Sequence, residues 1–313
     1  MKLLVLGGTS FLGRAVAESA LARGYELTLF TRGKTNPGLY PEAEHLRGDR
    51  DGGLAPLDGR RWDVVVDTSG YVPRVVRESA ELLRDSGRYV FVSSISVYAD
   101  FGTGPSEDSP LAQLGEMPDD QVSDDYSNYG PLKALCEAEV ERVFGERALL
   151  VRPGLIAGPH DPTGRFTYWA RRLRRGGDLL APGPPERRVQ FIDARDLGEW
   201  IVDAAARGLG GTFNATHEGV SWGELLEGAD VTWVPDAFLE EHEVGPWLEL
   251  PLWLPEGEYA GMHRADVSRA TAAGLRFRPV RETLAGAADA PQPDGVGLTP
   301  EREAQLLEAW RSR

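Results

Sequence analysis

Short apolar runs alternate with amphipathic helical segments through the first half of the chain. The runs lie at 3–6, 25–30, 63–67, 89–92 and 148–151, and helically spaced apolar residues occupy 11–22, 72–86 and 132–144. A continuous apolar run is typical of a strand that is buried on both faces of a parallel sheet. Helices that connect such strands cover those faces. The pattern therefore predicts an α/β chain built on a doubly wound parallel sheet.

The turn after the first apolar run is rich in glycine, and residues 7–13 read GGTSFLG. In a strand–turn–helix context, Gly7 permits the tight turn, Gly8 lets a ligand approach the backbone, and Gly13 lets the helix pack on the strand. Free N–H groups at the helix start would bind a pyrophosphate. Glycine also occurs in other βα turns, but this context predicts a Rossmann domain with a cofactor cradle made of Gly7, Thr9, Ser10, Phe11, Leu12 and Gly13.

The second half of the chain has a different composition. Residues 156–188 are rich in Gly, Pro and Arg, and seven of the eight tryptophans lie at or beyond Trp169. We expect residues 1–155 and 189–215 to form the dinucleotide-binding domain, and residues 156–188 and 216–313 to form a smaller C-terminal α/β substrate lobe. Residues 300–311, which start with a proline, are predicted to be the last helix.

Charge and cysteine content exclude several classes of protein. The net charge is −15, so the chain as a whole would be repelled by nucleic acid or an anionic membrane. One cysteine, Cys136, excludes an internal disulfide framework, and the five histidines show no ligand spacing, so we expect no metal site. There is no apolar run of about 18 residues and no leader pattern. We expect a cytoplasmic protein that binds no membrane.

The residues that follow the second apolar run bear on the choice of cofactor. An acid there would bond the ribose 2′-hydroxyl of NAD, whereas a basic residue accommodates the 2′-phosphate of NADP. The sequence at 29–34 is LFTRGK, so Arg32 and Lys34 favour NADP, with NAD as the alternative. The alternative is that Arg32 does not bind the 2′-phosphate and is a solvated loop residue or a partner of the adenine ring. Asp49 is a candidate for the adenine edge, or a solvated turn aspartate.

Tyr129 and Lys133 are one helical turn apart, on the same face of a predicted helix. The chain has nine tyrosines but only three lysines, so random placement would give only about 0.1 such pairs. A tyrosine with its ordinary pKa near ~10 is a poor base at neutral pH unless a nearby cation favours its phenolate. The pair predicts an acid/base site, and the alternative is two exposed side chains on one helix face.

Serines follow the fourth apolar run, at positions 93, 94 and 96. Open α/β sheets bind ligands at the carboxyl ends of their strands, so these hydroxyls are candidates for the same site. Each serine alone is also compatible with a turn or a helix cap.

These segments together resemble the extended or atypical short-chain dehydrogenase/reductase superfamily, in its NAD-dependent epimerase/dehydratase branch. The resemblance is carried by GGTSFLG (7–13), SSISVYAD (93–100) and YGPLK (129–133), and it continues in RPGLIAGPHD (152–161), VQFIDARDL (189–197) and ADVSRATAAGLRFRP (265–279). It implies that Ser94 is the catalytic serine, Tyr129 the acid/base and Lys133 its partner, with Pro153 beside the nicotinamide. The residues DTSG at 67–70 depart from the small apolar residues usual in the family.

The resemblance implies an NAD(P)-dependent oxidoreductase or an epimerase/dehydratase-like enzyme. It would transfer hydride and a proton at a hydroxyl or carbonyl carbon of a small substrate, with a nucleotide sugar as the candidate class. Family members often pair as homodimers. The alternative is an atypical member that keeps the fold but acts as an RNA-binding or regulatory protein, since GGTSFLG with FTRGK also resembles chloroplast stem-loop-binding proteins. The charge of −15 and the complete Ser–Tyr–Lys set argue against RNA.

The second half offers candidate substrate contacts, although tryptophan is more often a core residue than a ligand platform. Asp161 and Asp193 are more typical of turn caps than of catalytic carboxylates. The candidate anion contacts are Arg165, Arg172, Arg188 and Arg264, and the candidate stacking walls are Trp169, Trp222, Trp247 and Trp253.

Overall fold

The structure, a computed structural model, describes residues 1–257 and 259–313. Its centre is a parallel sheet of seven strands in the order β11-β6-β5-β4-β1-β2-β3. The chain adds β2 and β3 on one side of β1 and the later strands on the other side. This strand order is that of a doubly wound Rossmann domain and confirms the predicted fold class. The strands are β1 (Lys2–Leu6), β2 (Glu26–Thr31), β3 (Glu44–Arg47), β4 (Val64–Asp67), β5 (Arg88–Val92), β6 (Ala148–Pro153) and β11 (Gly211–Ala215).

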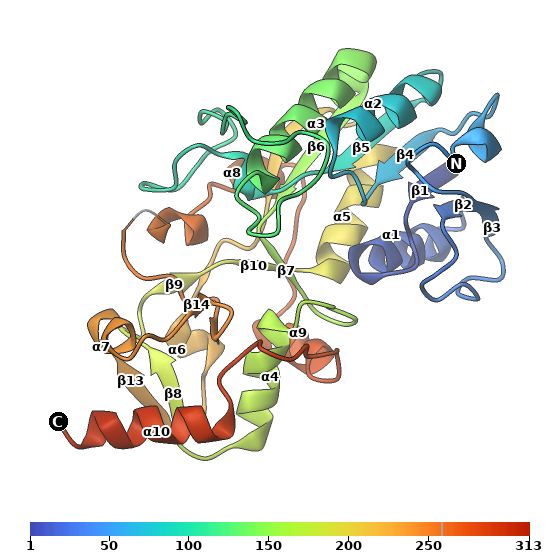
Figure 1. Ribbon diagram of the computed structural model, residues 1–313. Coiled ribbons are helices and arrows are strands. Elements are labelled where there is room, and N and C mark those ends of the chain that lie inside the picture. Colours follow the sequence, from blue (N-terminus) through green and yellow to red (C-terminus); the bar gives the residue numbers. More distant parts are fainter. Residues whose placement is uncertain (258) are drawn as a thin grey trace.

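Helices cover both faces of this sheet, as Figure 1 shows. One face carries α1 (Phe11–Ala22) and α5 (Ala194–Ala206), and the other carries α2 (Pro73–Leu82) and α3 (Tyr129–Phe144). Side chains of a strand alternate between the faces. Leu3 and Val5 of β1 therefore pack toward α1 and α5, while Leu4 and Leu6 pack toward α2 and α3. This alternation explains why the strand sequences are continuously apolar.

Two strands of the sheet were not predicted. The sequence of β3 is EHLR, and its residues are half-buried or exposed because it is the edge strand of the sheet. The sequence of β11 is GTFNA, and only its last two residues are buried. An apolar run was the sequence criterion for a strand, and an edge strand does not need one.

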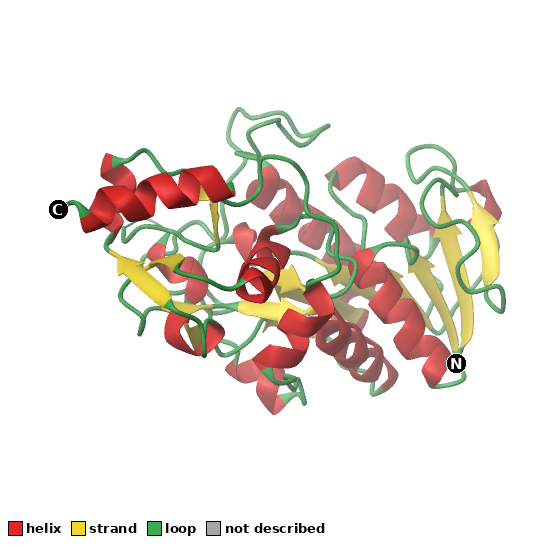
Figure 2. Cartoon of the chain, turned by 90° about the horizontal axis from the view of Figure 1, so that it is seen from below, coloured by secondary structure: helices red, strands yellow, loops and turns green. Residues whose placement is uncertain are grey.

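The C-terminal lobe extends away from the sheet, toward the C-terminus in Figure 2. Its longer strands, β8 (Leu179–Pro182) and β13 (Val231–Val234), pair in parallel. The predicted last helix is confirmed as α10 (Pro300–Arg311). The remaining α-helices of the chain as a whole are α4 (Arg165–Arg175), α6 (Trp222–Leu225), α7 (Asp236–Glu241), α8 (Ser268–Ala272) and α9 (Val280–Ala287). The remaining strands are short: β7 (Leu155–Ala157), β9 (Arg188–Val189), β10 (Phe191–Asp193), β12 (Val220–Ser221), β14 (Pro246–Trp247) and β15 (Leu250–Pro251). The division of the chain at residues 155, 188 and 215 stays a prediction.

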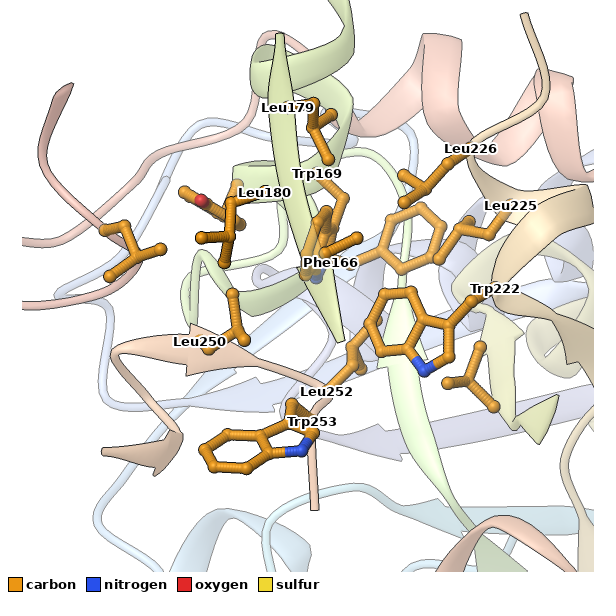
Figure 3. Close-up of a cluster of buried hydrophobic side chains, with 14 of the residues drawn as sticks. Phe166, Trp169, Leu179, Leu180, Trp222, Leu225, Leu226, Leu250, Leu252 and Trp253 are labelled. Carbon is orange, nitrogen blue, oxygen red and sulfur yellow. The ribbon is translucent and has the colours of Figure 1, made fainter. Parts of the chain in front are cut away.

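Three of the four tryptophans that were candidates for stacking walls are core residues. Trp169, Trp222 and Trp253 lie among leucines and Phe166 in the core of the lobe, as Figure 3 shows. Each is at most 1% exposed, so none can stack on a ligand. Trp247 is half-buried and remains a candidate.

Candidate active site

The glycine-rich turn brings the start of α1 close to the end of β1. Gly7 and Gly8 have φ values of 115° and 99°, which favour glycine. A Cβ on Gly13 would lie 2.6 Å from the backbone nitrogen of Gly8, so any side chain there would push helix and strand apart. The tight turn at Gly7 and the close packing at Gly13 agree with their predicted roles, whereas a Cβ on Gly8 would meet Leu29 at 2.6 Å, so ligand approach at Gly8 stays a prediction.

The other predicted cradle residues shape the same turn. Thr9 and Leu12 are buried, and the Thr9 carbonyl accepts a hydrogen bond of 2.9 Å from Asn36 Nδ2. Phe11 opens α1 with a φ of 36°. Ser10 is the N-cap residue of α1, and its side chain makes no capping hydrogen bond to the helix. Ser10 thus leaves the first N–H groups of α1 without a side-chain cap, and the pyrophosphate cradle stays a prediction.

Basic side chains gather where β2 ends. Arg32 and Lys34 are exposed in the loop after β2. Arg47 at the end of β3 lies opposite Thr31 in the sheet register, and its guanidinium donates a 2.8 Å hydrogen bond to the Thr31 hydroxyl. Sequence reasoning missed Arg47, because β3 was not predicted. Asp49 is exposed and accepts a hydrogen bond from the Asp51 N–H, as a turn aspartate does.

Tyr129 and Ser94 meet at the carboxyl edge of the sheet. Tyr129 is the first residue of α3, and Ser94 follows β5 as the N-cap of a short 3₁₀ turn (Ile95–Val97). Burial, followed by the nearby Tyr71, raises the pKa of the Tyr129 phenol, whereas the neighbouring Ser94 side chain and the charge of Arg165 lower it. The phenol therefore keeps its proton at neutral pH.

Lys133 lies one turn along α3, almost fully buried. Its ammonium donates hydrogen bonds of 2.7 Å to the carbonyls of Gly70 and Val92, at the ends of β4 and β5. It also lies over the rings of Tyr71 and Phe91. Burial lowers the pKa of Lys133 to about 8.

The expected effect of Lys133 on the Tyr129 phenol stays a prediction. In the structure the ammonium turns toward the strand ends, where two backbone carbonyls hold it. The catalytic role of Lys133 stays a prediction.

Gly130 explains why the serines and the tyrosine meet, and sequence reasoning missed it. A Cβ on Gly130 would lie only 2.0 Å from the carbonyl oxygen of Ser96. The start of α3 therefore touches the serine loop backbone to backbone. A glycine directly after Tyr129 was the signal that could have predicted this contact.

Replacing Gly130 with alanine is expected to separate Tyr129 from Ser94. Because the added methyl group meets backbone, we expect a loss of about 1–3 kcal/mol in the free energy of unfolding and a marked loss of turnover. Urea denaturation and steady-state rates would measure both. Gly38→Ala, at an open position without a positive φ, is the control for the loss of a glycine. An unchanged rate in Gly130→Ala would contradict the close approach.

Pro153 ends β6, beside the serine loop. Its neighbour strand is β5, and the N–H of Ser93 donates a 2.7 Å hydrogen bond to the Val151 carbonyl. The structure thus brings Pro153, Ser94, Tyr129 and Lys133 to one edge of the sheet. The glycine-rich turn opens at the same edge, because β1 and β5 are parallel strands on either side of β4.

A buried charged network lies behind this edge and was not predicted. Asp67, at the end of β4, is fully buried and forms an ion pair with Arg50. It also accepts hydrogen bonds from the Tyr89 hydroxyl and the Ser69 N–H. Arg50 holds the pKa of the Asp67 carboxyl below its usual range despite burial. Asp67 is the first residue of the DTSG segment that departs from the small apolar residues usual in the family. Its partner in the structure is Arg50.

One of the candidate anion contacts lies in the site. Arg165, the first residue of α4, stacks on the Trp247 ring at 4.9 Å, and its charge acts on Tyr129. Arg172 is instead buried in an ion pair with Glu303, Arg188 donates to backbone carbonyls, and Arg264 is exposed. Asp161 and Asp193 accept backbone N–H groups two residues ahead, as predicted for turn caps.

Among residues 1–257 and 259–313, no cluster of three or more His, Cys, Asp or Glu side chains could hold a metal ion. Within the same residues, no helix combines the length and apolarity that crossing a membrane requires.

Comparison with known proteins gives one family and several relatives. Residues 60–215 match the NAD dependent epimerase/dehydratase family. A chloroplast stem-loop binding protein of 41 kDa from Arabidopsis thaliana is 33% identical over 63% of this chain, and the match spans only 53% of that protein's length. A dTDP-6-deoxy-L-talose 4-dehydrogenase (NAD(P)(+)) from Kitasatospora kifunensis is 29% identical over 66% of this chain and 70% of its own.

Solved structures show the same fold. The enzyme WbmH of Bordetella bronchiseptica, in complex with NAD+, is 20% identical with a TM-score of 0.65, covering 94% of this chain and 99% of its own. A UDP-glucuronic acid 4-epimerase from Bacillus cereus, in complex with NAD, is 17% identical with a TM-score of 0.63, covering 92% of this chain and 96% of its own.

Proposed function

The chain belongs to the NAD-dependent epimerase/dehydratase family, and we propose that it is an NAD(P)-dependent enzyme that acts on a nucleotide sugar. The observation that carries the proposal is the close approach of the start of α3, which carries Tyr129, to the serine loop, at the sheet edge where the glycine-rich turn opens. A proton donor and a cofactor cradle at one edge are what hydride transfer at a hydroxyl or carbonyl carbon requires.

The cradle residues would hold a nicotinamide dinucleotide. The N–H groups at the start of α1 would bind the pyrophosphate, and Gly13 keeps the start of α1 close to the backbone of Gly8. When bound, the cofactor supplies the hydride chemistry. Pro153 would lie beside the nicotinamide, and Lys133, at the ends of β4 and β5, would bond a ribose hydroxyl.

Tyr129 would exchange the proton with the substrate oxygen. Its raised pKa keeps the phenol protonated, so it would donate its proton to a carbonyl oxygen that becomes a hydroxyl. In the reverse direction, the deprotonated phenol would accept the proton of a substrate hydroxyl as its carbon gives up a hydride. Ser94 would hold that oxygen through its hydroxyl.

The arrangement of Arg165 supports an anionic substrate. Burial lowers the pKa of its guanidinium, and Trp247 holds the planar group. A buried guanidinium is well suited to a phosphate or carboxylate. The relative from Kitasatospora is described as acting on a dTDP-sugar with NAD(P)+, which is consistent with a nucleotide sugar here.

We propose that the chain prefers NADP to NAD. Arg32, Lys34 and Arg47 surround the end of β2, where the adenosine ribose lies in this fold. Arg32→Ala and Arg47→Ala are each expected to weaken NADP about tenfold, because a charge-assisted hydrogen bond is worth about 1.5–3 kcal/mol before solvent screening. The affinity for NAD would not change. Calorimetric titration would measure both, with Arg61→Ala as the surface control; equal losses for both cofactors would contradict the preference.

Ligand-induced stabilisation tests the proposed function. NAD or NADP is expected to raise the midpoint of thermal unfolding, and a UDP- or dTDP-sugar is expected to raise it further in the presence of the cofactor. Inorganic pyrophosphate is the control for simple anion binding. A chain that is stabilised by neither dinucleotide would not be the enzyme proposed here.

An RNA-binding role is not favoured, although one relative is a stem-loop binding protein. The arginine pairs that could bind RNA are engaged within the protein. Their partners are acidic side chains or backbone carbonyls, as shown by Arg171 with Ala290, Arg172 and Arg175 with Glu303, Arg174 with Asp289, Arg187 with Asp236, and Arg188 with Gly219.

Pairing as a homodimer through helices of the sheet domain stays a proposal. The outer faces of α2 and α3 carry a network of ion pairs, in which Arg77 contacts Glu139 and Arg142 contacts both Glu139 and Glu81. A dimer that buries this face would have to match these charges across the interface.

A further inference from the structure

Two exposed tyrosines lie next to the Tyr129 ring. Tyr71 follows β4, and Tyr126 lies in the loop just before α3. The centre of each ring is 6.4 Å from the centre of the Tyr129 ring, at interplanar angles of 39° and 67°. Tyr71 is 48% exposed and Tyr126 is 70% exposed. The predicted site therefore has two aromatic side chains that the protein core does not cover.

The loop that carries Tyr126 is firmly held. Tyr126 has a φ of 58°, a conformation that costs a side chain free energy and persists only where the surroundings enforce it. Asn128, fully buried, donates to the carbonyls of Pro118 and Gln121 and accepts from the Ser123 N–H. Asp125 accepts from both the N–H and the hydroxyl of Ser127. These hydrogen bonds fix the turn that holds the Tyr126 ring in its exposed position.

Tyr71 is positioned by the site itself. The ammonium of Lys133 lies 5.1 Å from the centre of its ring, within the range of a cation–π interaction. The same lysine binds the Gly70 carbonyl, one residue before Tyr71. The position of this ring is therefore tied to a residue of the predicted active site.

We infer that Tyr71 and Tyr126 are specificity-determining substrate contacts, whose rings receive the apolar C–H face of a sugar next to the Tyr129 phenol. This inference rests on the proposed function. A sugar whose reacting oxygen contacts the Tyr129 phenol would lie next to these rings, because the centre of each is 6.4 Å from the centre of the Tyr129 ring. A sugar ring has an apolar face that packs on an aromatic ring, and rigid aromatic side chains supply contact area at low entropic cost.

Binding of sugar nucleotides to cofactor-loaded protein tests this inference. Calorimetry in a Tyr129→Phe background, where turnover is blocked, would use UDP-glucose and dTDP-glucose, with UDP and dTDP as probes that lack the sugar. Tyr71→Ala and Tyr126→Ala are each expected to weaken the sugar nucleotides about tenfold and to leave UDP and dTDP unchanged. Tyr71→Phe and Tyr126→Phe keep the ring and are expected to bind as the parent does, as is Leu135→Ala at an exposed position on α3.

Each remaining outcome is decisive. Equal losses for the sugar nucleotides and the free nucleotides would show that the rings contact the nucleotide, which overturns the inference. Unchanged affinity in both alanine variants would overturn it while leaving the proposed function intact. A parent protein that binds NAD or NADP but none of the four probes would overturn both.

Discussion

Replacing Tyr129 with phenylalanine is expected to lower turnover by about 10²- to 10⁴-fold, the usual contribution of a positioned general acid or base. The affinity for NAD or NADP is expected to stay the same, because the variant removes only the hydroxyl that meets Ser94. The ring remains between Tyr71 and Tyr126, so the site keeps its shape. Steady-state rates and calorimetric cofactor titration would separate the two effects.

Tyr25→Phe is the matched control for this substitution. Tyr25 immediately precedes β2, at the opposite edge of the sheet from the site, so the loss of its hydroxyl is expected to leave turnover unchanged. A Tyr129→Phe protein that works at the rate of the parent would reject Tyr129 as the proton donor. If Tyr129→Phe lowered the cofactor affinity and left turnover unchanged, the Tyr129 hydroxyl would act in cofactor binding.

Replacing Arg152 with methionine is expected to lower the free energy of unfolding by about 3–5 kcal/mol, the usual cost of removing one partner of a buried ion pair. Arg152 in β6 donates 2.9 Å and 2.6 Å hydrogen bonds to the two carboxylate oxygens of Glu137 in α3. Both side chains are at most 5% exposed. The substitution therefore leaves the Glu137 carboxylate buried without its cation. Urea denaturation would measure the loss.

The double variant distinguishes this cause from poor packing. Arg152→Met combined with Glu137→Met removes both charges, and a buried ion pair replaced by apolar residues is often tolerated. We expect the double variant to regain most of the stability that the single variant loses. A double variant that is less stable than Arg152→Met would show that packing, or the hydrogen bond from Arg152 to the Tyr98 hydroxyl, matters more than the charge.

The buried strands and the cofactor turn could be predicted from the sequence because their physical requirements are local. A strand covered on both faces is apolar along its length, and a turn that leaves no room for a Cβ has glycine, as at Gly8 and Gly13. The edge strand β3 escaped prediction because one side of it faces solvent. Arg47 escaped prediction with it, although the register places it opposite Thr31.

The candidate site was predicted in part, and the missing part depends on side-chain direction. The spacing of Tyr129 and Lys133 places them on one helix face, but it does not reveal that the ammonium would bind the carbonyls of Gly70 and Val92. The pairing of Arg50 with Asp67 joins two strand ends that are not neighbours in the sequence. Arg165 was one of four candidate arginines, and only the packing of the lobe shows that it faces Tyr129.

The formation of reduced nicotinamide tests the central claim most directly. Protein loaded with NAD or NADP would be mixed with UDP- and dTDP-sugars, and the absorbance of the reduced nicotinamide would be followed in a stopped-flow instrument. We predict that at least one sugar nucleotide produces a reduced-nicotinamide signal in the parent, and that Tyr129→Phe suppresses it while still binding the cofactor. A sugar nucleotide that is converted by the parent without any reduced nicotinamide, or an equal signal in Tyr129→Phe, would contradict the account.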